Sequence, residues 1–329
     1  MNYDIKYMER CIQLAQCGEY GAAPNPMVGA VIVHKGRIIG EGYHRRCGGP
    51  HAEVNAICSV KRLELLSEST LYVSLEPCAH YGKTPPCADL IIENRIPRIV
   101  VGAQDPFSKV NGLGIKRLRD AGAEVIVGVM EKECLALNER FITFHKKKRP
   151  WILLKWAQSQ DGFIAREDGS AVTFSTPETQ VLVHRLRAYS KAIMIGTRTS
   201  LHDNPKLTAR LWPGHNPLRV SIDRHNILPN NLNIKSNEAE TVIYQTGDLK
   251  RILSDLHQRN IQTLMVEGGK QLLQSFINEG LWDKIRIETS PIILGEGISA
   301  PQIPCARIIE ETEIDGNNIQ ILRPLCFEY

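Results

Sequence analysis

The chain has 329 residues, of which 43% are hydrophobic and 23% charged, and its formal net charge is +4 at pH 7. This length has room for two domains with proper cores, and the composition is that of an ordinary soluble protein without an acidic or basic tail. No run approaches the roughly 18 apolar residues of a membrane span, and the first residues lack the basic and apolar pattern of a signal peptide.

Hydrophobic periodicity in the first half predicts strands that alternate with helices, a pattern typical of an α/β sandwich. The predicted helices are residues 4–17, one that begins near His51, one that begins near Cys87, and residues 113–121. The predicted strands are residues 28–34, 37–42, 71–75, 98–102 and 124–127. A basic run at 146–149 then interrupts the pattern, and we interpret it as a solvated connector at a domain boundary.

The stretch from His51 to Cys87 carries the sharpest chemical signal. It contains His51, Glu53 two residues later, Cys78 after a proline, and then Cys87. One imidazole and two thiolates fit a tetrahedral zinc with an open fourth position, beside a carboxylate that is not a ligand. Zinc lowers the pKa of a bound water toward about 7, and Glu53 would then shuttle protons to a ring nitrogen and a leaving amine. The pattern predicts a hydrolytic deaminase centre.

Prolines mark the predicted helix starts of the first half, and seven further cysteines are spread over the whole chain. Pro50 is expected in the first turn of the helix that carries Glu53, and a Pro-Pro pair at 85–86 precedes the helix that begins near Cys87. The other seven cysteines have no framework spacing and are expected to be buried thiols: Cys11, Cys17, Cys47, Cys58, Cys134, Cys305 and Cys326.

A second alternation of strands and helices begins at Trp151. The predicted strands are residues 152–156, 192–195, 219–222, 242–245, 263–266 and 284–288, and the predicted helices are 177–189, 249–259 and 271–279. No zinc pattern recurs there. The sequence therefore predicts two different domains, residues 1–146 and 150–329.

Distinctive motifs occur along nearly the whole chain. In the first half they are Ala23-Pro-Asn-Pro-Met-Val-Gly-Ala-Val-Ile-Val33, Gly40-Glu-Gly-Tyr-His44, Pro50-His-Ala-Glu53 and Leu75-Glu-Pro-Cys-Ala-His-Tyr-Gly-Lys-Thr-Pro-Pro-Cys87. In the second half they are Lys155-Trp-Ala-Gln-Ser-Gln-Asp-Gly162, the segment 196–208 and Val266-Glu-Gly-Gly269. Together these motifs resemble the bifunctional deaminase–reductase family of riboflavin biosynthesis. The eight residues between the two cysteines are the best discriminator, because cytidine, guanine and tRNA-adenosine deaminases usually carry a tight Pro-Cys-x-x-Cys.

The resemblance implies a fold and two reactions. The fold is an N-terminal cytidine-deaminase-like α/β/α sandwich followed by a dihydrofolate-reductase-like α/β domain. The first reaction is zinc-dependent deamination of 2,5-diamino-6-(5-phospho-ribosylamino)pyrimidin-4(3H)-one. The second is NADPH-dependent reduction of 5-amino-6-(5-phospho-ribosylamino)uracil to the ribitylamino product.

The resemblance also implies site residues. In the deaminase half, Glu53 would be catalytic, zinc would be held by His51, Cys78 and Cys87, and the substrate would be bound by Asn25, His44, His80 and Lys83. In the reductase half, the expected substrate contacts are Lys155, Arg187, Leu207, Arg210 and Glu267. The expected NADPH contacts are Ala157, Thr199, Asp203, Gly268 and Gly269.

One segment departs from the family pattern. Members usually read Gly-(Glu/Asp)-Ser-x-Trp-Ile-(Thr/Ser), whereas this chain has Ala171 in place of the serine and Thr173 in place of the tryptophan. Gln160 also stands where a leucine is common. These departures leave open an alternative in which the deaminase is active and the reductase domain is impaired or only structural. A second alternative is base editing in RNA through the basic run, which the spaced cysteines and the modest net charge disfavour.

The sequence further predicts partners and location. Small phosphorylated pyrimidines are the expected substrates, and no nucleic-acid or membrane partner is expected. Reduced cysteines and a thiolate zinc site favour the cytoplasm. Two-domain proteins with exposed sheet edges commonly form symmetric assemblies, so a homodimer or homotetramer is expected.

Overall fold

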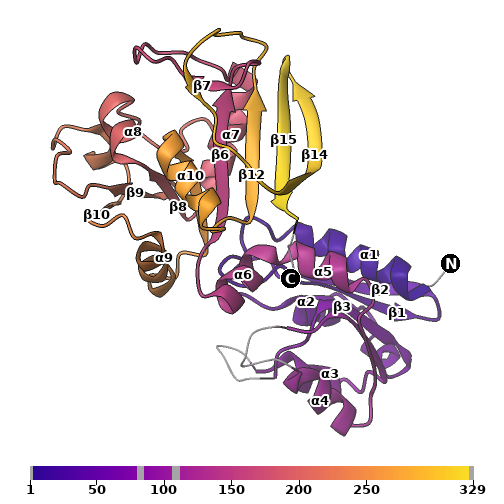
Figure 1. Ribbon diagram of the computed structural model, residues 1–329. Helices are drawn as coiled ribbons and strands as arrows, with labels where there is room; N and C mark the ends of the chain where they lie inside the picture. Colours follow the sequence, from indigo (N-terminus) through magenta and orange to yellow (C-terminus); the bar gives the residue numbers. More distant parts are fainter. Residues whose placement is uncertain (1–2, 80–84, 106–111, 326–329) are drawn as a thin grey trace. The chain divides into compact units, whose positions relative to one another are not determined.

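The structure is a computed structural model that describes residues 3–79, 85–105 and 112–325. It divides the chain at residue 147 into two compact units, each of which is described by itself (Figure 1). Strands and helices alternate in both units, which confirms the predicted α/β class. Among the described residues, no helix combines the length and the apolar character that a bilayer crossing needs.

The first unit is built on a five-stranded sheet of order β2-β1-β3-β4-β5. Its strands are β1 (Gly29–His34), β2 (Arg37–Tyr43), β3 (Thr70–Leu75), β4 (Arg98–Ala103) and β5 (Glu124–Val127). β1 pairs antiparallel with β2 and β3, whereas β3, β4 and β5 run parallel. The helices are α1 (Tyr3–Gln16), α2 (Ala52–Cys58), η1 (Leu63–Glu68), α3 (Cys87–Glu93), α4 (Leu113–Asp120), α5 (Glu131–Leu137) and α6 (Glu139–Lys147).

Both faces of this sheet are covered because its central strands are apolar on both sides. Successive side chains of a strand point to opposite faces. Val31 and Tyr72 pack with α1 and α5 on one face, while Ile32 and Val73 pack with α2, α3 and α4 on the other (Figure 1). The result is the predicted three-layer sandwich, with the segment that carries Cys78 directly after β3.

The second unit is built on an eight-stranded sheet of order β10-β9-β8-β11-β6-β12-β15-β14. Its strands are β6 (Trp151–Gln158), β8 (Ala192–Ile195), β9 (Leu218–Ile222), β10 (Thr241–Tyr244), β11 (Thr263–Gly268), β12 (Lys284–Thr289), β14 (Ala306–Ile314) and β15 (Asn317–Pro324). The strands from β10 to β12 in that order are parallel neighbours, and β15 and β14 add an antiparallel hairpin. A small separate ladder joins β7 (Phe163–Ala165) to β13 (Ile298–Ser299).

Helices cover both faces of the second sheet. They are α7 (Pro177–Tyr189), α8 (Thr197–His202), η2 (Asn233–Lys235), α9 (Leu249–Gln258) and α10 (Lys270–Asn278). Leu154 and Val266 pack with α9 and α10, whereas Leu153 and Met265 pack with α7. β14 lies at the sheet edge and is exposed along most of its length.

The basic run at 146–149 is only in part the solvated connector that we expected: Lys146, Lys147 and Lys148 are exposed, whereas Arg149 is half-buried. Lys146 and Lys147 form the end of α6, and Arg149 makes a two-pronged ion pair with the buried Asp283, with nitrogen–oxygen distances of 2.6 and 2.9 Å. The Asp283 carboxylate also accepts a hydrogen bond from the Ile152 backbone N–H at 2.8 Å. Arg149 therefore anchors the start of β6.

The expectation of seven buried cysteines is partly wrong. Cys11 and Cys134 are buried between the sheet and its helices, as expected. The exposed thiols are Cys17, Cys47, Cys58 and Cys305. Cys326 lies outside the described residues.

Candidate active sites

The structure brings the three predicted zinc ligands together. His51 Nδ1 lies 3.5 Å from Cys78 Sγ and 3.3 Å from Cys87 Sγ, and the three ligand atoms all lie within 4.8 Å of one another. Ligand atoms bound to one tetrahedral zinc at about 2.0–2.3 Å lie roughly 3.3–3.8 Å from each other. The donor set and its spacing therefore fit zinc.

Three separate elements deliver these ligands. Cys78 follows β3, His51 is the N-cap of α2, and Cys87 is the first residue of α3 with Pro86 as its N-cap. Pro50 stands one position before the N-cap of α2, so the expectation that it lies in the first helical turn is wrong. At the start of α3, the Cys87 N–H donates to Cys78 Sγ at 3.3 Å, so this helix start favours the thiolate form of Cys78.

The two sulfurs behave as one acid–base pair. A hydrogen bond from the Cys87 thiol, followed by one from the His51 ring, lowers the pKa of Cys78 to about 4. The Cys78 thiolate in turn raises the pKa of Cys87 well above its usual range. A divalent cation held by both sulfurs favours loss of their protons, because it stabilises both thiolates.

Glu53 lies in the first turn of α2 and is only 3% exposed. Burial is the main cause that raises the pKa of Glu53 to about 7, with the neighbouring Cys78 thiolate adding to it. A carboxyl group with a pKa near neutrality can both take up and release a proton at physiological pH.

Asn25 and His44 extend the site on the side of α2. Asn25 Nδ2 lies 3.1 Å from His44 Nε2, and His44 Nδ1 lies 3.1 Å from the Pro50 carbonyl oxygen. The ring of His44 meets the ring of His51 edge-on, with centroids 5.3 Å apart. Burial lowers the pKa of His44, so its ring is neutral at pH 7. The other two predicted contacts, His80 and Lys83, lie outside the described residues.

Sequence reasoning missed Glu76, which lies two residues before Cys78. Its carboxylate is 4% exposed and accepts hydrogen bonds from four backbone N–H groups. The donors are Asp105 and Gly112 on Oε2, at 3.2 and 2.9 Å, and Gly114 and Ile115 on Oε1, at 2.9 and 3.2 Å. A signal was present, since a glutamate is out of place directly after an apolar strand unless it has partners.

In the second unit, the structure brings together three of the predicted substrate residues. Arg187 in α7 makes a two-pronged ion pair with Glu267 at the end of β11, with distances of 2.8 and 2.6 Å. Its remaining Nη1 donates to the Thr208 carbonyl oxygen at 3.3 Å. Lys155 in β6 lies beside this pair: burial lowers the pKa of Lys155, and the charge of Glu267 opposes that shift.

Three of the predicted cofactor contacts, Thr199, Gly268 and Gly269, lie where β11 meets α10. Gly268 ends β11 and Gly269 is the N-cap of α10 with a φ of +58°, a conformation that favours glycine. A Cβ atom at Gly269 would lie 3.1 Å from Thr199 Oγ1, so Thr199 lies directly against this turn. Asp203 is the C-cap of α8, the helix that carries Thr199, while Ala157 lies near the end of β6.

The remaining two predicted substrate residues lie in the segment that follows α8. Leu207 is buried and has a φ of +54°, which is rare for a residue with a branched side chain. Arg210 is exposed.

A buried polar cluster on β12 was also missed. Glu288 is fully buried, and its carboxylate accepts hydrogen bonds from Asn317 Nδ2 at 2.8 Å and from Arg286 Nη1 at 3.1 Å. Arg286 is the sheet neighbour of Lys155. Asn317 also donates to the Phe174 carbonyl oxygen at 2.8 Å, which fixes the end of the segment that departs from the family pattern. Charged residues that alternate with isoleucine along 284–288 are the sequence signal of a polar face.

Comparisons with known proteins assign a family to each half of the chain. Residues 1–103 match the family of cytidine and deoxycytidylate deaminase zinc-binding regions, and residues 150–310 match the RibD C-terminal domain. The riboflavin biosynthesis protein RibD of Aquifex aeolicus is 38% identical over 97% of this chain and 96% of its own length. The protein of the same name from Escherichia coli is 36% identical over 89% of each chain.

Solved structures extend the likeness to the whole fold. The diaminohydroxyphosphoribosylaminopyrimidine deaminase/5-amino-6-(5-phosphoribosylamino)uracil reductase of Thermotoga maritima is 37% identical, with a TM-score of 0.86 over 98% of this chain and 99% of that one. The structure of Acinetobacter baumannii RibD called form 1 is 32% identical, with a TM-score of 0.87 over 98% of this chain and 99% of that one.

Fold and sites together define a bifunctional enzyme that joins a zinc-dependent deaminase half to an NADPH-dependent reductase half. The chain belongs to the RibD family of riboflavin biosynthesis proteins. No comparison supports the alternative of an impaired or purely structural reductase half.

Proposed function

We propose that residues 1–146 deaminate 2,5-diamino-6-(5-phospho-ribosylamino)pyrimidin-4(3H)-one and that residues 150–329 reduce the resulting 5-amino-6-(5-phospho-ribosylamino)uracil. The observation that carries the first half is the convergence of His51, Cys78 and Cys87 on one point beside the buried Glu53. The second half rests on the buried Arg187–Glu267 pair beside Lys155.

In the deaminase, His51, Cys78 and Cys87 would hold zinc. When bound, zinc would act as a Lewis acid that lowers the pKa of its water ligand toward about 7. Glu53 takes one proton from the attacking water and passes it to the ring nitrogen. It then carries the second proton, from the new hydroxyl group on the ring carbon, to the amine, which leaves as ammonia as the C=O forms. Its pKa of about 7 suits both directions of transfer.

Substrate positioning in the deaminase falls to groups around this centre. Asn25 presents a donor and an acceptor to the pyrimidinone edge, and its hydrogen bond to His44 fixes its orientation. We keep His80 and Lys83 as further substrate contacts, since Lys83 suits a phosphate as a point charge.

In the reductase, Ala157, Thr199, Asp203, Gly268 and Gly269 would bind NADPH, which supplies a hydride to the sugar carbon. Backbone N–H groups at the start of α10 suit its pyrophosphate. Lys155, with its lowered pKa, holds or gives up a proton close to the sugar.

The other proposed substrate contacts of the reductase would have two roles, to hold Glu267 in place and to bind the substrate phosphate. Arg187 already binds Glu267 with two hydrogen bonds and so holds that carboxylate in place. The exposed Arg210 can bind the substrate phosphate with its guanidinium. Leu207, with its positive φ, sets the direction of the backbone just before Arg210.

The experiment is a coupled assay of the purified protein on the diaminopyrimidinone phosphate, with and without NADPH, in which ammonia, zinc content and NADPH absorbance are measured. We expect ammonia release in both cases and NADPH oxidation only after deamination. Zinc-free protein that still releases ammonia would refute the first half. Failure to oxidise NADPH with added deaminated substrate would refute the second.

We also propose a cytoplasmic homodimer or homotetramer. Among the described residues β14 lies at the edge of its sheet and is mostly exposed, which supports association, because exposed sheet edges readily pair. Light scattering of the purified protein measures its mass in solution, and a monomer at working concentration would contradict this.

A further inference from the structure

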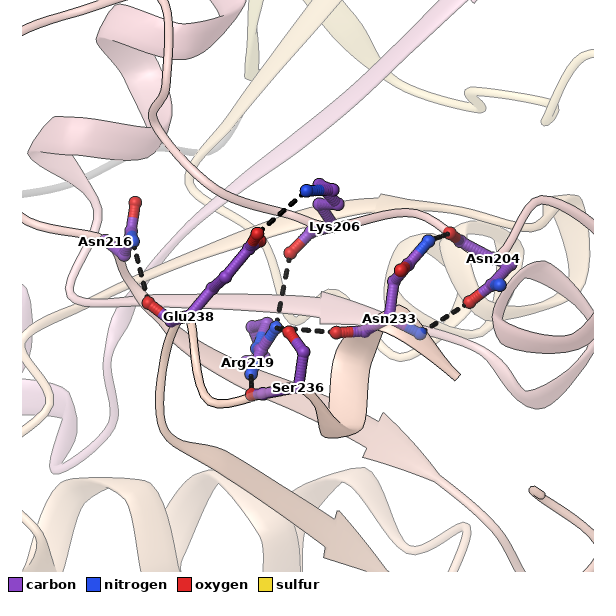
Figure 2. A network of polar contacts seen from close by, with 7 residues as sticks. All are labelled: Asn204, Lys206, Asn216, Arg219, Asn233, Ser236 and Glu238. Atoms are coloured by element: carbon purple, nitrogen blue, oxygen red, sulfur yellow. Dashed lines mark hydrogen bonds and ion pairs between the residues drawn. The ribbon is translucent and has the colours of Figure 1, made fainter. Parts of the chain in front are cut away.

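Arg219 lies on β9 and is 1% exposed, yet among the described residues its guanidinium makes no ion pair with a carboxylate. It donates instead to the backbone carbonyl oxygens of Lys206, Asn233 and Ser236 and to Ser236 Oγ (Figure 2). It also donates to the Ala239 carbonyl oxygen. The Asn233 contact is 2.8 Å and the Lys206 contact is 3.5 Å. One buried cation thus ties the segment after α8 to the loop at 233–239.

Asn233 carries this tie onward to Asn204. The Asn233 backbone N–H donates to Asn204 Oδ1 at 2.7 Å, and Asn233 Nδ2 donates to the Asn204 carbonyl oxygen at 2.6 Å (Figure 2). Asn204 is therefore held at both its side chain and its backbone. Since the Asn233 carbonyl is itself held by Arg219, the guanidinium controls Asn204 through one intermediate residue.

The segment held in this way has an unusual backbone. Asn204 has a φ of +40° and Leu207 a φ of +54°, both in the left-handed region. Asparagine tolerates that region, but leucine rarely occupies it unless the surroundings enforce it. The far side of the segment is held from α7, where Arg187 binds the Thr208 carbonyl and His184 Nδ1 accepts from the Leu211 N–H. The bend is fixed from two sides.

We infer that Arg219 is a positioning residue of the reductase: it sets the conformation of residues 203–210 and thereby places Asp203 on the cofactor and Leu207 and Arg210 on the substrate. The inference rests on the proposed function of those three residues. Arg219 itself touches neither ligand, because it is buried and its Nη donors are bound to the loop.

The test compares Arg219→Lys with a matched control, Lys206→Met. Lysine keeps the charge of Arg219 but has a single nitrogen in place of the fork that reaches several carbonyls. Lys206→Met removes the half-exposed ion pair to Glu238, at the outer rim of the same network, and leaves the Lys206 carbonyl in place (Figure 2). A displacement of about 1 Å at a binding group can cost about 100-fold in rate.

We expect Arg219→Lys to lower kcat/KM for the aminouracil phosphate about 10- to 100-fold, to raise KM for that substrate and to weaken NADPH binding in a fluorescence titration. Ammonia release by the deaminase half of the same chain measures the amount of intact protein in each sample. It should stay within about twofold of wild type in Arg219→Lys. Both activities of Lys206→Met should also stay within about twofold of wild type. A merely structural role would lower kcat in step with the fraction of folded protein and leave KM unchanged, which would overturn the inference.

A second variant guards against misfolding of the first. Asn233→Ala removes the hydrogen bond from the Asn233 side chain to the Asn204 carbonyl oxygen, but it keeps the Asn233 carbonyl that Arg219 binds. It should therefore raise KM as Arg219→Lys does, by a smaller factor. Normal KM values in both variants would refute the inference while the proposed function stands. A wild-type protein that neither binds NADPH nor oxidises it would refute the proposed function, and the inference with it.

Discussion

Replacing Glu76 by glutamine tests how the first unit holds its zinc ligands. The carboxylate of Glu76 accepts four backbone N–H groups, two on each oxygen. Glutamine keeps one oxygen and places an NH₂ group where the other was, so two buried N–H donors then face a donor. Hydrogen bonds to a charged group contribute about 1.5–3 kcal/mol each. At 4% exposure water cannot replace them. The expected loss is about 3–6 kcal/mol, against a typical domain stability of about 5–15 kcal/mol.

The assay follows zinc release from the full-length protein in increasing urea, with a colorimetric chelator. We expect Glu76→Gln to release zinc at a much lower urea concentration than wild type, because Glu76 fixes the end of β3 just before Cys78. Glu9→Gln, an exposed change on α1, is the matched control and should behave as wild type. NADPH oxidation with added deaminated substrate reports that the second unit is intact. Equal release midpoints for Glu76→Gln, Glu9→Gln and wild type would show that the four N–H groups do not depend on the carboxylate.

Three further predictions follow from the described sites. Glu53→Gln keeps the shape of the side chain but ends its proton exchange, so ammonia release should fall about 10²–10⁴-fold at unchanged zinc content; normal deamination would remove Glu53 from the reaction. Cys87→Ser removes a thiolate ligand and should lower the zinc content by metal analysis, whereas Cys305→Ser, at an exposed thiol, should keep one zinc per chain. His184 is 4% exposed, and burial, followed by the charge of Arg187, lowers its pKa to about 4 from 6.5. Because the unfolded state then binds more protons between these values, stability of the second unit should fall by at most about 3 kcal/mol as the pH drops from about 6.5 to 4. Urea unfolding of His184→Gln should show a smaller pH dependence, and an equal slope in both proteins would contradict this account.

Sequence patterns predicted the regular core elements well. The strands at 124–127 and 192–195 and the helix at 177–189 have the predicted bounds. The strands are short apolar runs rich in β-branched residues, and the helix has Pro177 in its first turn after Thr176, whose side chain caps the Thr179 N–H. These signals are local in the sequence, so they predict the element without knowledge of its long-range contacts.

The elements that were missed lack such local signals. β14 is exposed at most positions and carries Arg307, Glu310, Glu311 and Glu313, so its sequence shows no apolar alternation. Its strand conformation comes from pairing with β15. The helices α5 and α6 were missed too, and they are short elements of 7 and 9 residues.

The same distinction separates the site residues that were found from those that were not. His51, Cys78 and Cys87 were identified because metal ligands must be particular side chains at particular spacings. Glu76 and Arg219 were not, because their partners are backbone N–H and carbonyl groups, which every residue carries. The partners of Glu76 begin 29 residues away in the sequence. Only the fold reveals that such side chains have a task.

The order of strands in the two sheets has a consequence for synthesis on the ribosome. Every strand of the first sheet comes from residues 29–127, so that sheet can close before the rest of the chain has been made. The second sheet begins with β6, whose neighbours β11 and β12 emerge about 100 or more residues later, a wait of about 5–20 s at about 5–20 residues per second. During that interval an apolar strand has no partner. The reductase half is thus the part of the nascent chain that most needs protection by chaperones, because its apolar strand stays unpaired. The deaminase half can bind and keep its metal during the same interval.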